Sequence, residues 1–545
     1  MDPRTQRILE FDRIVAQLAD QAASEPGREL CLALQPSPDL DEVLVRQSET
    51  EDAVRVLLEK GVPPLSGISD VRSALARASL GAMLSCLELL RIGAVLRAAA
   101  RLKGFLPERA EGWADNAVFR ILRTLDPLRP LEQALTDAIL GEDEVADRAS
   151  PELASIRRRI REAQAEVKAH LDHLVRSGRY AKALQESLVT QRNGRYVVPV
   201  KVESRGEIPG IVHDASSSGA TLFVEPMPVV EANNRIRELL ADERDEIDRI
   251  LQDLSLRVGA VSGTLGETLA RMARVDFLVA RGRLALAMKA MRPQVGTGGR
   301  IRLVRARHPL IPANRVVPVD FWIGDTFRTL LVTGPNTGGK TVALKTCGLL
   351  TLMGLSGLQI PAADGSEISV FDSVMADIGD EQSIDQDLST FSSHMRSVVR
   401  IVAEAGDRSL VLLDELGSGT DPAEGAALAM SILEHLRGRG AVVVATTHYK
   451  ELKSYALRTG GVENACCEFD SETLRPTFRL LIGVPGVSNA FAISRRLGLP
   501  DSLIEAASRF MTEEGVRFEE LVRRVEARRV EAERDREEAS ALLAR

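Results

Sequence analysis

Aromatic residues are scarce in this sequence, where they make up 4% of 545 residues. A core built without them must consist mostly of Leu, Val, Ile and Ala, a composition that suits long helices. Cysteine is scarce as well. The five cysteines are odd in number, and Cys466 and Cys467 are adjacent, a spacing that does not fit a metal site. We therefore expect reduced, buried thiols in a cytoplasmic protein.

An apolar signal core is missing from the N-terminal residues. The most apolar run covers residues 346–363, and its length alone fits a membrane helix. This run is interrupted by Thr346, Thr351, Ser356 and Gln359, however, and it directly follows a glycine-rich loop. We interpret it as a buried helix and the strand after it, and we expect no membrane partner.

An excess of basic residues is also missing. The 70 Lys and Arg residues are outnumbered by 78 Asp and Glu residues, so the net charge is −8. Any contact with nucleic acid must therefore come from a local basic surface, because phosphate neutralisation is local. The apolar fraction of 44% and the charged fraction of 27% are ordinary for a globular protein. A chain of this length is expected to form several domains.

Hydrophobic spacing divides the first half of the chain into an all-helical part and an arm. Residues 1–125 show helical spacing and few strand signals. Heptad-like spacing then predicts one long helix within residues 126–185 and a returning helix at 228–262. Residues 186–227, between them, combine apolar strands with glycine-rich turns. An antiparallel helix pair that carries a small β-rich tip is an arm.

The second half of the chain is expected to be α/β. Residues 263–510 alternate apolar strands with helical runs. Residues 511–545 are charged and heptad-like and end at Arg545 with neither cap nor turn, which is typical of a chain cut within a helix, although frayed termini look the same. The expected fold class is therefore multidomain, with a helical core, an arm, an α/β domain and a C-terminal helix.

A phosphate-binding loop is predicted after the strand RTLLVT. Residues 334–341 fit the pattern G-x-x-x-x-G-K-[ST], and a helical run follows, which is the context that the pattern requires. Its glycines let backbone N–H groups approach phosphates, and the helix N-terminus adds positive potential. We expect ATP and Mg²⁺ as cofactors, with Lys340 on the β- and γ-phosphates and Thr341 on Mg²⁺. The predicted nucleotide-binding residues are Gly334, Pro335, Asn336, Thr337, Gly338, Gly339, Lys340 and Thr341.

Three more side chains are predicted to act on the nucleotide. Asp414 ends the apolar strand SLVLL and fits a residue that supports Mg²⁺, and Glu415 fits a base that orients the attacking water. An Asp-Glu pair after a strand is commonly ordinary surface, but a phosphate loop upstream favours the functional interpretation. His448 ends the strand AVVVATT, and a histidine there is commonly structural. Because ligands bind beyond the carboxyl ends of parallel strands, we predict that His448 contacts the γ-phosphate.

Four stretches in order carry a family resemblance: TGPNTGGKT, DIGDEQSIDQDLSTFSSHM, LLDELGSGTDPAEGAALA and ATTHYKELK. Together they resemble the ATPase domain of the MutS family, and they are most similar to its second bacterial type. GIVHDASSSGATLFVEP and FRLLIGVPGVSNAFAISRRLGL agree, so the resemblance covers essentially the whole chain. It implies an ABC-type P-loop ATPase domain at residues 263–510, lever helices at 126–185 and 228–262, and a clamp at the tip, residues 186–227.

The resemblance also implies a homodimer with composite nucleotide sites. The second subunit would offer Ser389 and Thr390 in trans, and the loop Gly417–Asp421 would couple the two sites. Read from the residues alone, LSTFSSHM is a polar helix start with an N-cap. In this family, residues 483–510 would form a helix-turn-helix that locks the dimer, and not a pair of helices that reads DNA.

The clamp tip carries candidate residues for nucleic-acid contact, namely Arg192, Arg195, Lys201 and Arg205. Alternate residues of a strand share one face, so these side chains fit a surface that follows a phosphate backbone. A solvated strand face is the simpler interpretation, and Glu203 and Glu207 in the same tip weaken the nucleic-acid one.

Two departures from the MutS pattern shape the expected function. The sequence has no room for a mismatch-reading domain, and the Smr endonuclease domain of the second type is not found in it. We see no His, Asp and Glu spacing that indicates a nuclease site. Mismatch repair is therefore not expected, and endonuclease activity would belong to residues outside this sequence.

The resemblance leaves two principal functions open. One is an ATP-dependent clamp on branched DNA that suppresses homologous recombination, reading shape rather than base sequence. The other is an ATP-dependent sensor that splits collided ribosomes. A transporter-type or chromosome-maintenance ABC ATPase shares the P-loop chemistry, but LSTFSSHM stands where transporters have an LSGGQ-like segment.

Overall fold

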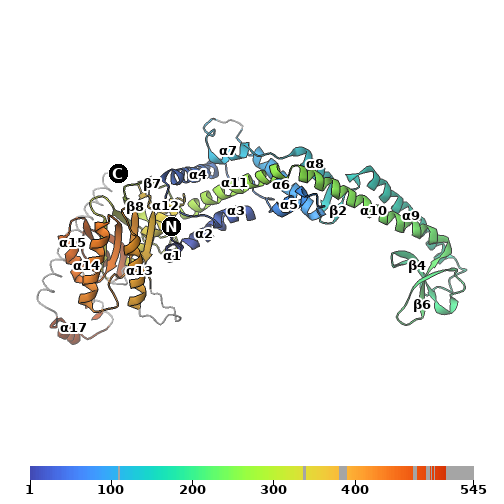
Figure 1. Cartoon of the computed structure of the whole chain (residues 1–545). Coiled ribbons are helices and arrows are strands. Elements are labelled where there is room, and N and C mark those ends of the chain that lie inside the picture. Colours follow the sequence, from blue (N-terminus) through green and yellow to red (C-terminus); the bar gives the residue numbers. More distant parts are fainter. Residues whose placement is uncertain are drawn as a thin grey trace, which may run out of the picture. The chain divides into compact units, whose positions relative to one another are not determined.

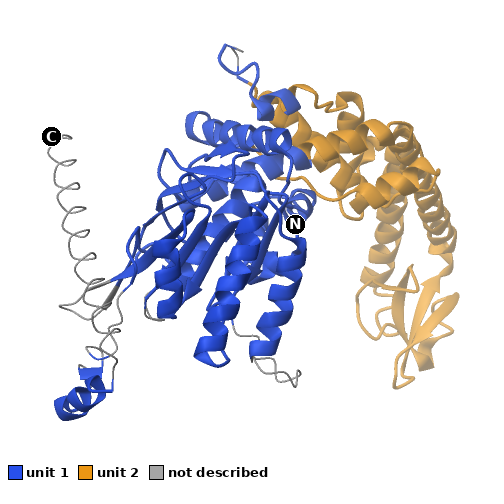
Figure 2. Cartoon of the chain, turned by 60° about the vertical axis from the view of Figure 1, so that its left-hand side comes forward, with its two compact units in different colours: residues 1–63, 107–121, 273–545 blue, residues 64–106, 122–272 orange. Residues whose placement is uncertain are grey.

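The computed structural model describes residues 1–107, 111–334, 339–379, 390–470, 475–486, 491, 494–495 and 498–510. Helices and several sheets are both present, so the predicted mixed class of α and α/β structure is confirmed. The chain divides into two compact units, each made of segments that are not continuous in sequence (Figure 2). Unit 1 contains residues 1–63, 107–121 and 273–545, and unit 2 contains residues 64–106 and 122–272. The finer domain boundaries remain predictions.

The N-terminal helices of unit 1 are α1 (Pro3–Ile8), α2 (Phe11–Ala19), α3 (Glu25–Leu32) and α4 (Leu40–Glu59). Helix α3 begins at a buried carboxylate. Asp276 accepts hydrogen bonds from the backbone N–H groups of Ala23 and Ser24 and from the Ser24 hydroxyl. Ser24 in turn caps α3 by accepting from the N–H group of Gly27. A side chain more than 250 residues away in sequence therefore sets the start of this helix.

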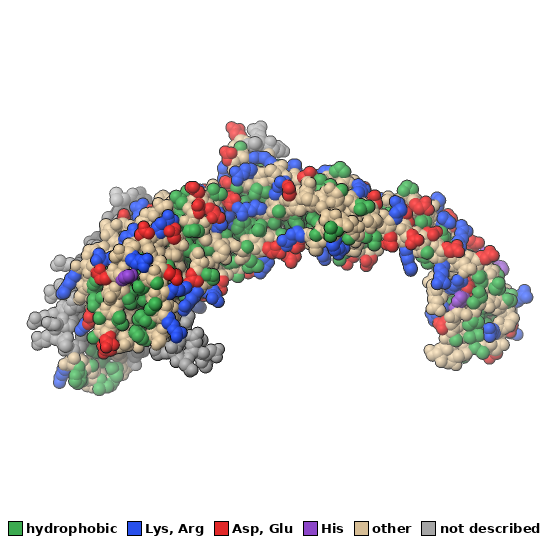
Figure 3. All heavy atoms as spheres, viewed as in Figure 1, with side chains coloured by type: hydrophobic (Ala, Val, Ile, Leu, Met, Phe, Trp, Pro, Cys, Tyr) green, Lys and Arg blue, Asp and Glu red, His purple; other side chains and the backbone are tan. Residues whose placement is uncertain are grey.

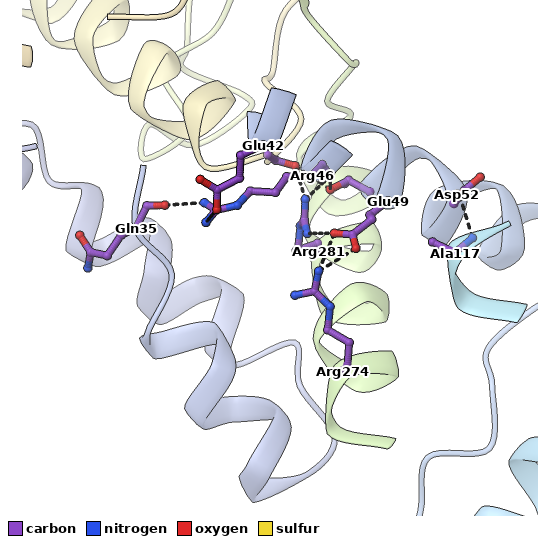
Figure 4. A network of polar contacts seen from close by, with 10 residues as sticks. Gln35, Glu42, Arg46, Glu49, Asp52, Ala117, Arg274 and Arg281 are labelled. Atoms are coloured by element: carbon purple, nitrogen blue, oxygen red, sulfur yellow. Dashed lines mark hydrogen bonds and ion pairs between the residues drawn. The ribbon is translucent and has the colours of Figure 1, made fainter. Parts of the chain in front are cut away.

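Helix α11 (Ser262–Met288) carries Asp276, and its C-terminal part holds the fully buried Arg281. Figure 4 shows this guanidinium directed from α11 toward Glu49 on α4. Arg281 donates to the carbonyl of Arg46 and, at 2.8 Å, to the carbonyl of Gly357, and it lies 3.3 Å from a Glu49 oxygen. Glu49 also pairs with Arg274 at 2.7 Å, so this carboxylate, 13% exposed, has two cationic partners.

The network ends on helix α12 (Lys340–Leu355), which follows the phosphate loop. Gln47 donates to the carbonyls of Gly354 and Leu358, and Thr50 donates to that of Gly357. The last carbonyls of a helix have no partners within the helix. Here Gln47 of α4 donates to one of them, that of Gly354, while the carbonyls of Gly357 and Leu358, just past the end of α12, accept from side chains of α4 and α11. The guanidinium of Arg281 suits the negative end of the helix dipole.

A six-stranded sheet forms the centre of unit 1, in the order β12-β13-β14-β10-β15-β16. Neighbouring strands from β12 to β15 are parallel, and β16 pairs antiparallel with β15. The strands are β10 (Thr329–Thr333), β12 (Ser373–Asp377), β13 (Ser409–Leu413), β14 (Val442–Thr447), β15 (Val462–Asp470) and β16 (Arg475–Ile482). A second sheet of β7 (Gln294–Gly296), β8 (Ile301–Ala306), β9 (Val319–Ile323) and β11 (Glu367–Ser369) also lies in unit 1.

Helices pack against the six-stranded sheet (Figure 1). Ile401 of α13 (Thr390–Glu404), Leu433 of α14 (Pro422–Gly438) and Leu452 of α15 (Lys450–Arg458) join one buried cluster with residues of β13 and β14. Helix α12 also packs closely on the sheet, because a Cβ atom at Gly348 would lie 2.4 Å from Leu412. A short helix, α17 (Asp501–Ser508), follows later in the chain.

Unit 2 contains two long helices that lie side by side, α9 (Pro151–Arg176) and α10 (Met227–Ala260) (Figure 1). Polar contacts join them at one end, where the Ser150 hydroxyl donates to Glu246 at 2.6 Å and Arg157 pairs with Glu243. Shorter elements complete the unit: α5 (Arg72–Ser79), α6 (Cys86–Gly104), α8 (Arg129–Ala138), β1 (Ile139–Gly141) and β2 (Glu144–Val145), with α7 (Ala117–Arg123) at the unit boundary.

The clamp tip lies between α9 and α10 in sequence and forms an antiparallel sheet in the order β3-β4-β6-β5. Its strands are β3 (Thr190–Arg192), β4 (Arg195–Lys201), β5 (Gly210–Ala215) and β6 (Thr221–Pro226). Val198 and Val224 of the sheet are buried in one cluster with Leu171 of α9 and Ile236 of α10. Apolar contact with both helices therefore anchors the tip.

The apolar run at residues 346–363 belongs to a buried helix, as predicted, because α12 continues to Leu355 and most of its residues are buried. The strand expected at the end of the run begins later, with β11 at Glu367. None of the helices in the described part of the chain combines the length and apolar character needed to cross a membrane.

Candidate nucleotide site

The register of the central sheet brings the ends of three strands to one edge. Thr333 of β10 is paired with Thr447 of β14, and Leu413 of β13 is paired with Ala445 of β14. Gly334, Asp414 and His448 each follow directly after one of these strands, so the structure places all three at the same edge. This edge is where open parallel sheets bind ligands.

The phosphate loop has the backbone conformation that its glycines allow. Gly334 has φ +126° and Gly339 has φ +90°, in regions that residues with a Cβ atom rarely adopt. A Cβ atom at Gly339 would also lie 2.9 Å from the Phe478 ring. Helix α12 begins at Lys340, directly after Gly339, so its N-terminus faces the loop. Pro335, Asn336, Thr337 and Gly338 lie outside the described residues.

Lys340 is buried, and its ammonium donates to the carbonyl of Gly334 at 2.6 Å. Burial lowers the pKa of Lys340, because desolvation disfavours the charged form, while the nearby Glu415, Cys467 and Asp414 act in the opposite direction. A buried ammonium beside a helix N-terminus and a glycine loop is the combination that holds phosphate. The geometry therefore fits the predicted contact with the β- and γ-phosphates.

Asp414 is held by two hydroxyl groups. Thr341 of α12 donates to Asp414 Oδ2 at 2.7 Å, and Thr446 of β14 donates to Asp414 Oδ1. The N–H group of Asp414 donates to the carbonyl of Asp377 at 2.8 Å, which fixes the backbone as well. A hydroxyl and a carboxylate side by side form the oxygen donor set that Mg²⁺ prefers, with phosphate oxygens and water as the remaining ligands. Thr341 and Asp414 therefore fit the predicted Mg²⁺ site.

A metal site built from protein side chains alone is a different arrangement. Among the described residues, no group of three or more His, Cys, Asp or Glu side chains is placed to hold a metal ion. A magnesium site next to a phosphate loop requires only one or two protein ligands, since substrate phosphates complete it.

Glu415 follows Asp414 with φ +48°, in the left-handed region. Its N–H group donates to the Thr446 hydroxyl at 2.8 Å, and its carbonyl accepts from Ser418 at 3.0 Å. The half-buried Glu415 carboxylate lies near enough to Lys340 for its charge to raise the pKa of that ammonium. The position is consistent with the predicted role of Glu415 as a base.

His448 is exposed at the end of β14, and its ring lies 4.5 Å from that of Tyr449. Its exposed ring lies at the same edge of the sheet as Asp414, as predicted for a ligand contact. Tyr449 is buried, and its hydroxyl donates to the carbonyl of Gly417 at 2.9 Å. The strand end that carries His448 is thus tied to the loop after Glu415.

The segment predicted to act in trans is only partly described. Ser389 lies outside the described residues, and Thr390 begins α13 but its side chain is likewise not described. The next residue, Phe391, contacts the loop Gly417–Asp421 of its own chain, since a Cβ atom at Gly419 would lie 3.2 Å from Phe391 Cβ. Of the predicted helix-turn-helix at 483–510, only α17 and a few residues before it are described, and residues 511–545 are not.

Sequence reasoning missed two polar side chains at this edge. Thr446 contacts both acidic residues, as given above, and Asp377 at the end of β12 lies 2.9 Å from His394 Nδ1 of α13. A hydrophilic residue at the end of an apolar strand was the available signal in both places. Their importance follows from the strand order, which a single sequence does not reveal.

The four basic residues of the clamp tip differ in their partners and in their exposure. Arg195 pairs with the fully buried Glu225 at 2.8 Å and donates to Asn234, so its guanidinium is part of the internal structure of the tip. His213 and Asn233 also contact Glu225. The three side chains that contact this carboxylate, Arg195, His213 and Asn233, compensate for its burial.

The other three basic residues are more accessible. Arg192 lies over the Phe223 ring at 4.3 Å and 3.6 Å from Asp214, with part of its side chain exposed. Lys201 is half-buried and Arg205 is exposed. Figure 3 shows basic side chains interspersed with acidic ones over the α9 and α10 region, rather than one continuous basic surface. A contact with phosphates at the tip would therefore use Arg192, Lys201 and Arg205.

Comparison with known proteins decides the family. Residues 330–514 match the family model described as MutS domain V. The chain is 54% identical to the Endonuclease MutS2 of Ruminiclostridium cellulolyticum over 533 residues, which cover 98% of this chain and 67% of that protein. The chain belongs to the MutS2 family. The resemblance to the second MutS type, predicted from the ordered motifs, is thus confirmed.

Two further MutS2 relatives agree. The Endonuclease MutS2 of Acetivibrio thermocellus is 52% identical over 96% of this chain and 66% of its own length. The corresponding protein of Pelotomaculum thermopropionicum is 50% identical over 99% of this chain and 69% of its own length. The chain therefore spans about two thirds of the length of these MutS2 relatives.

Proposed function

We propose that this chain is the ATP-hydrolysing part of a dimeric clamp that binds branched DNA and suppresses homologous recombination. The observation that carries the ATPase part is the arrangement of Thr341, Asp414 and Thr446 beside the buried Lys340, at the carboxyl edge of a parallel sheet. Membership of the MutS2 family supports the nucleic-acid part, since the relatives are named endonucleases.

Each residue of the site has one proposed task. Lys340 and the N-terminus of α12 bind the β- and γ-phosphates, and Thr341 and Asp414 hold Mg²⁺. Bound Mg²⁺ neutralises charge on the phosphate oxygens. Glu415 accepts a hydrogen bond from the attacking water and orients it toward the γ-phosphorus, and His448 contacts the γ-phosphate. Positioning and electrostatic stabilisation account for most of the catalysis in this class of reaction.

We also propose that the sites are composite. A second copy of the chain would supply Ser389 and Thr390, and residues 483–510 would hold the two copies together. The contact of Phe391 with Gly419 supports a coupling route, because it joins the segment that serves the partner's site to the loop after Glu415. The six domains proposed are residues 1–125, 126–185, 186–227, 228–262, 263–510 and 511–545.

Two substitutions test the ATPase assignment. Lys340→Ala removes the phosphate-binding ammonium and is expected to abolish ATP binding. Glu415→Gln keeps the shape of the side chain but not its basicity, so it is expected to bind ATP and hydrolyse it at least a hundredfold more slowly, within the range that a general base contributes. Glu415→Gln with wild-type turnover would refute the base assignment. In a mixture, Lys340→Ala and Ser389→Ala chains should recover activity, since each mixed dimer contains one intact composite site.

A binding experiment tests the proposed target. Glu415→Gln protein with ATP is incubated with equal amounts of a four-way DNA junction and of collided ribosomes, and the mixture is sedimented. Protein on the junction supports the DNA clamp. Protein that sediments with the ribosomes would replace this proposal with ribosome splitting. Protein that sediments with neither would mean that this chain hydrolyses ATP but does not recognise either target by itself. Lys340→Ala protein is the matched control, because it is expected to remain unbound in both cases.

A further inference from the structure

The hydroxyl of Thr446 lies between the two acidic residues of the nucleotide site. Thr446 belongs to β14 and is completely buried. The parallel register of Leu413 with Ala445 places it beside Asp414, one residue past the end of β13. Its Oγ1 donates to Asp414 Oδ1 and accepts from the N–H group of Glu415 at 2.8 Å.

These two hydrogen bonds occupy the hydroxyl in complementary ways. A threonine hydroxyl has one hydrogen to donate and two lone pairs to accept with. The hydroxyl donates its hydrogen to Asp414, and one of its lone pairs accepts from the N–H group of Glu415, so both hydrogen bonds form at the same time. Because Thr341 donates to the other carboxylate oxygen at 2.7 Å, each oxygen of Asp414 has its own hydroxyl donor. Rotation of the carboxylate would break at least one of these bonds.

The contact with Glu415 acts on the backbone. Glu415 has φ +48°, a conformation that costs roughly 1 kcal/mol or more for a residue with a Cβ atom. Thr446 holds both sides of this residue, since its hydroxyl accepts from the Glu415 N–H group and its carbonyl accepts from the Leu416 N–H group at 3.0 Å. Without the hydroxyl, the N–H group of Glu415 would lose its partner, a loss that disfavours the left-handed turn.

We propose that Thr446 is a positioning residue that sets the orientation of Asp414 and Glu415 at the same time. The inference rests on the proposed ATPase function. Thr446 acts through its hydroxyl, by keeping the Asp414 carboxylate beside Thr341 and the Glu415 backbone in the turn that directs its side chain. Loss of the hydroxyl should therefore lower the rate of the chemical step far more than the affinity for ATP.

The test compares three variants of the full chain. Thr446→Val replaces the hydroxyl with a methyl group of similar volume, and Thr446→Ser restores the hydroxyl. Thr447→Val is the matched control, because Thr447 is an equally buried neighbour on the same strand whose hydroxyl accepts only from Tyr449 among the described residues. ATP turnover, the Kd for ATP, and the hydrogen exchange of the Glu415 amide in nucleotide-free protein are measured.

We expect Thr446→Val to lower kcat at least tenfold, to change the Kd for ATP less than threefold, and to speed up Glu415 amide exchange at least tenfold. Thr446→Ser should return all three within threefold of wild type, and Thr447→Val should stay within twofold. Wild-type kcat and exchange in Thr446→Val would overturn the assignment, and so would a Thr446→Ser chain as impaired as Thr446→Val. A wild-type chain with no ATP turnover would instead overturn the proposed function, while the exchange measurement still decides whether the hydroxyl holds Glu415.

Discussion

Replacement of the buried Arg281 by methionine should destabilise unit 1 through the network that anchors the end of α12. The guanidinium donates to the carbonyls of Arg46 and Gly357 and lies 3.3 Å from Glu49 (Figure 4). Methionine keeps much of the apolar stem but none of these donors. Thr50 also donates to both carbonyls, yet its hydroxyl has a single hydrogen, so it cannot satisfy both after the substitution.

The size of the effect follows from opposing terms. A hydrogen bond from a charged donor contributes about 1.5–3 kcal/mol, so the two carbonyl bonds contribute roughly 3–6 kcal/mol. Burial opposes this gain, and it lowers the pKa of Arg281 to about 9. Glu49 retains Arg274 at 2.7 Å, so no unpaired buried charge remains. We therefore expect Arg281→Met to lower the free energy of unfolding by about 2–3 kcal/mol, below the cost of breaking an isolated buried pair.

Tryptophan fluorescence during urea unfolding measures this effect within unit 1. The chain has two tryptophans, Trp113 and Trp322, and both belong to that unit. Arg274→Met is the control, because Arg274 contacts the same Glu49 but is 39% exposed, and it should cost less than about 1 kcal/mol. An Arg281→Met chain within about 1 kcal/mol of wild type, or an equal loss in Arg274→Met, would refute the reasoning.

The remaining predictions concern other buried contacts. The hydrogen bond from Arg249 lowers the pKa of Glu246 to about 2, so its stabilisation is complete above pH 4.5 and is lost as the pH falls toward 2. Glu246→Gln should therefore lower the free energy of unfolding of unit 2 by about 1 kcal/mol at pH 6, a modest loss because Arg249 is 63% exposed. Near pH 2 the variant should be as stable as the wild type when unfolding is followed by circular dichroism. Gly27→Ala should lower the free energy of unfolding of unit 1 by at least about 1–3 kcal/mol, since its Cβ atom would lie 2.2 Å from the Asp276 carboxylate. Gly266→Ala, in the part of helix α11 that belongs to unit 2 and with nothing within 4 Å of the new methyl group, should instead raise the free energy of unfolding by about 0.5–1 kcal/mol when unfolding is followed by circular dichroism, and equal effects in the two glycine variants would contradict the packing argument.

Local patterns were sufficient for the elements that carry the site. The strands that end at Thr333, Leu413 and Thr447 each contain a buried apolar run, as expected for strands buried on both faces of a parallel sheet. The glycines at 334 and 339 adopt the positive φ values that a phosphate loop requires. These features depend on neighbouring residues only, so a single sequence predicts them.

Charge and exposure at the clamp tip were harder to predict. Alternation along a strand identifies the residues that share a face, but it does not identify their partners across the sheet. Arg195 was predicted as a candidate phosphate contact, yet its partner Glu225 lies 30 residues further along the chain and is completely buried. Arg192, Lys201 and Arg205 therefore remain the stronger candidates at the tip.

The sequence by itself determined the family, the mixed α and β class and the chemistry available at the phosphate loop, because ordered motifs and hydrophobic periodicity are properties of neighbouring residues. Only the tertiary structure decided which side chains meet. The strand order places β14 beside β13, which brings the Thr446 hydroxyl to Asp414 and Glu415. Packing of α11 against α4 and the end of α12 likewise creates a buried site for Arg281. Such contacts join residues far apart in the chain, and their partners are set by register and packing rather than by local preference.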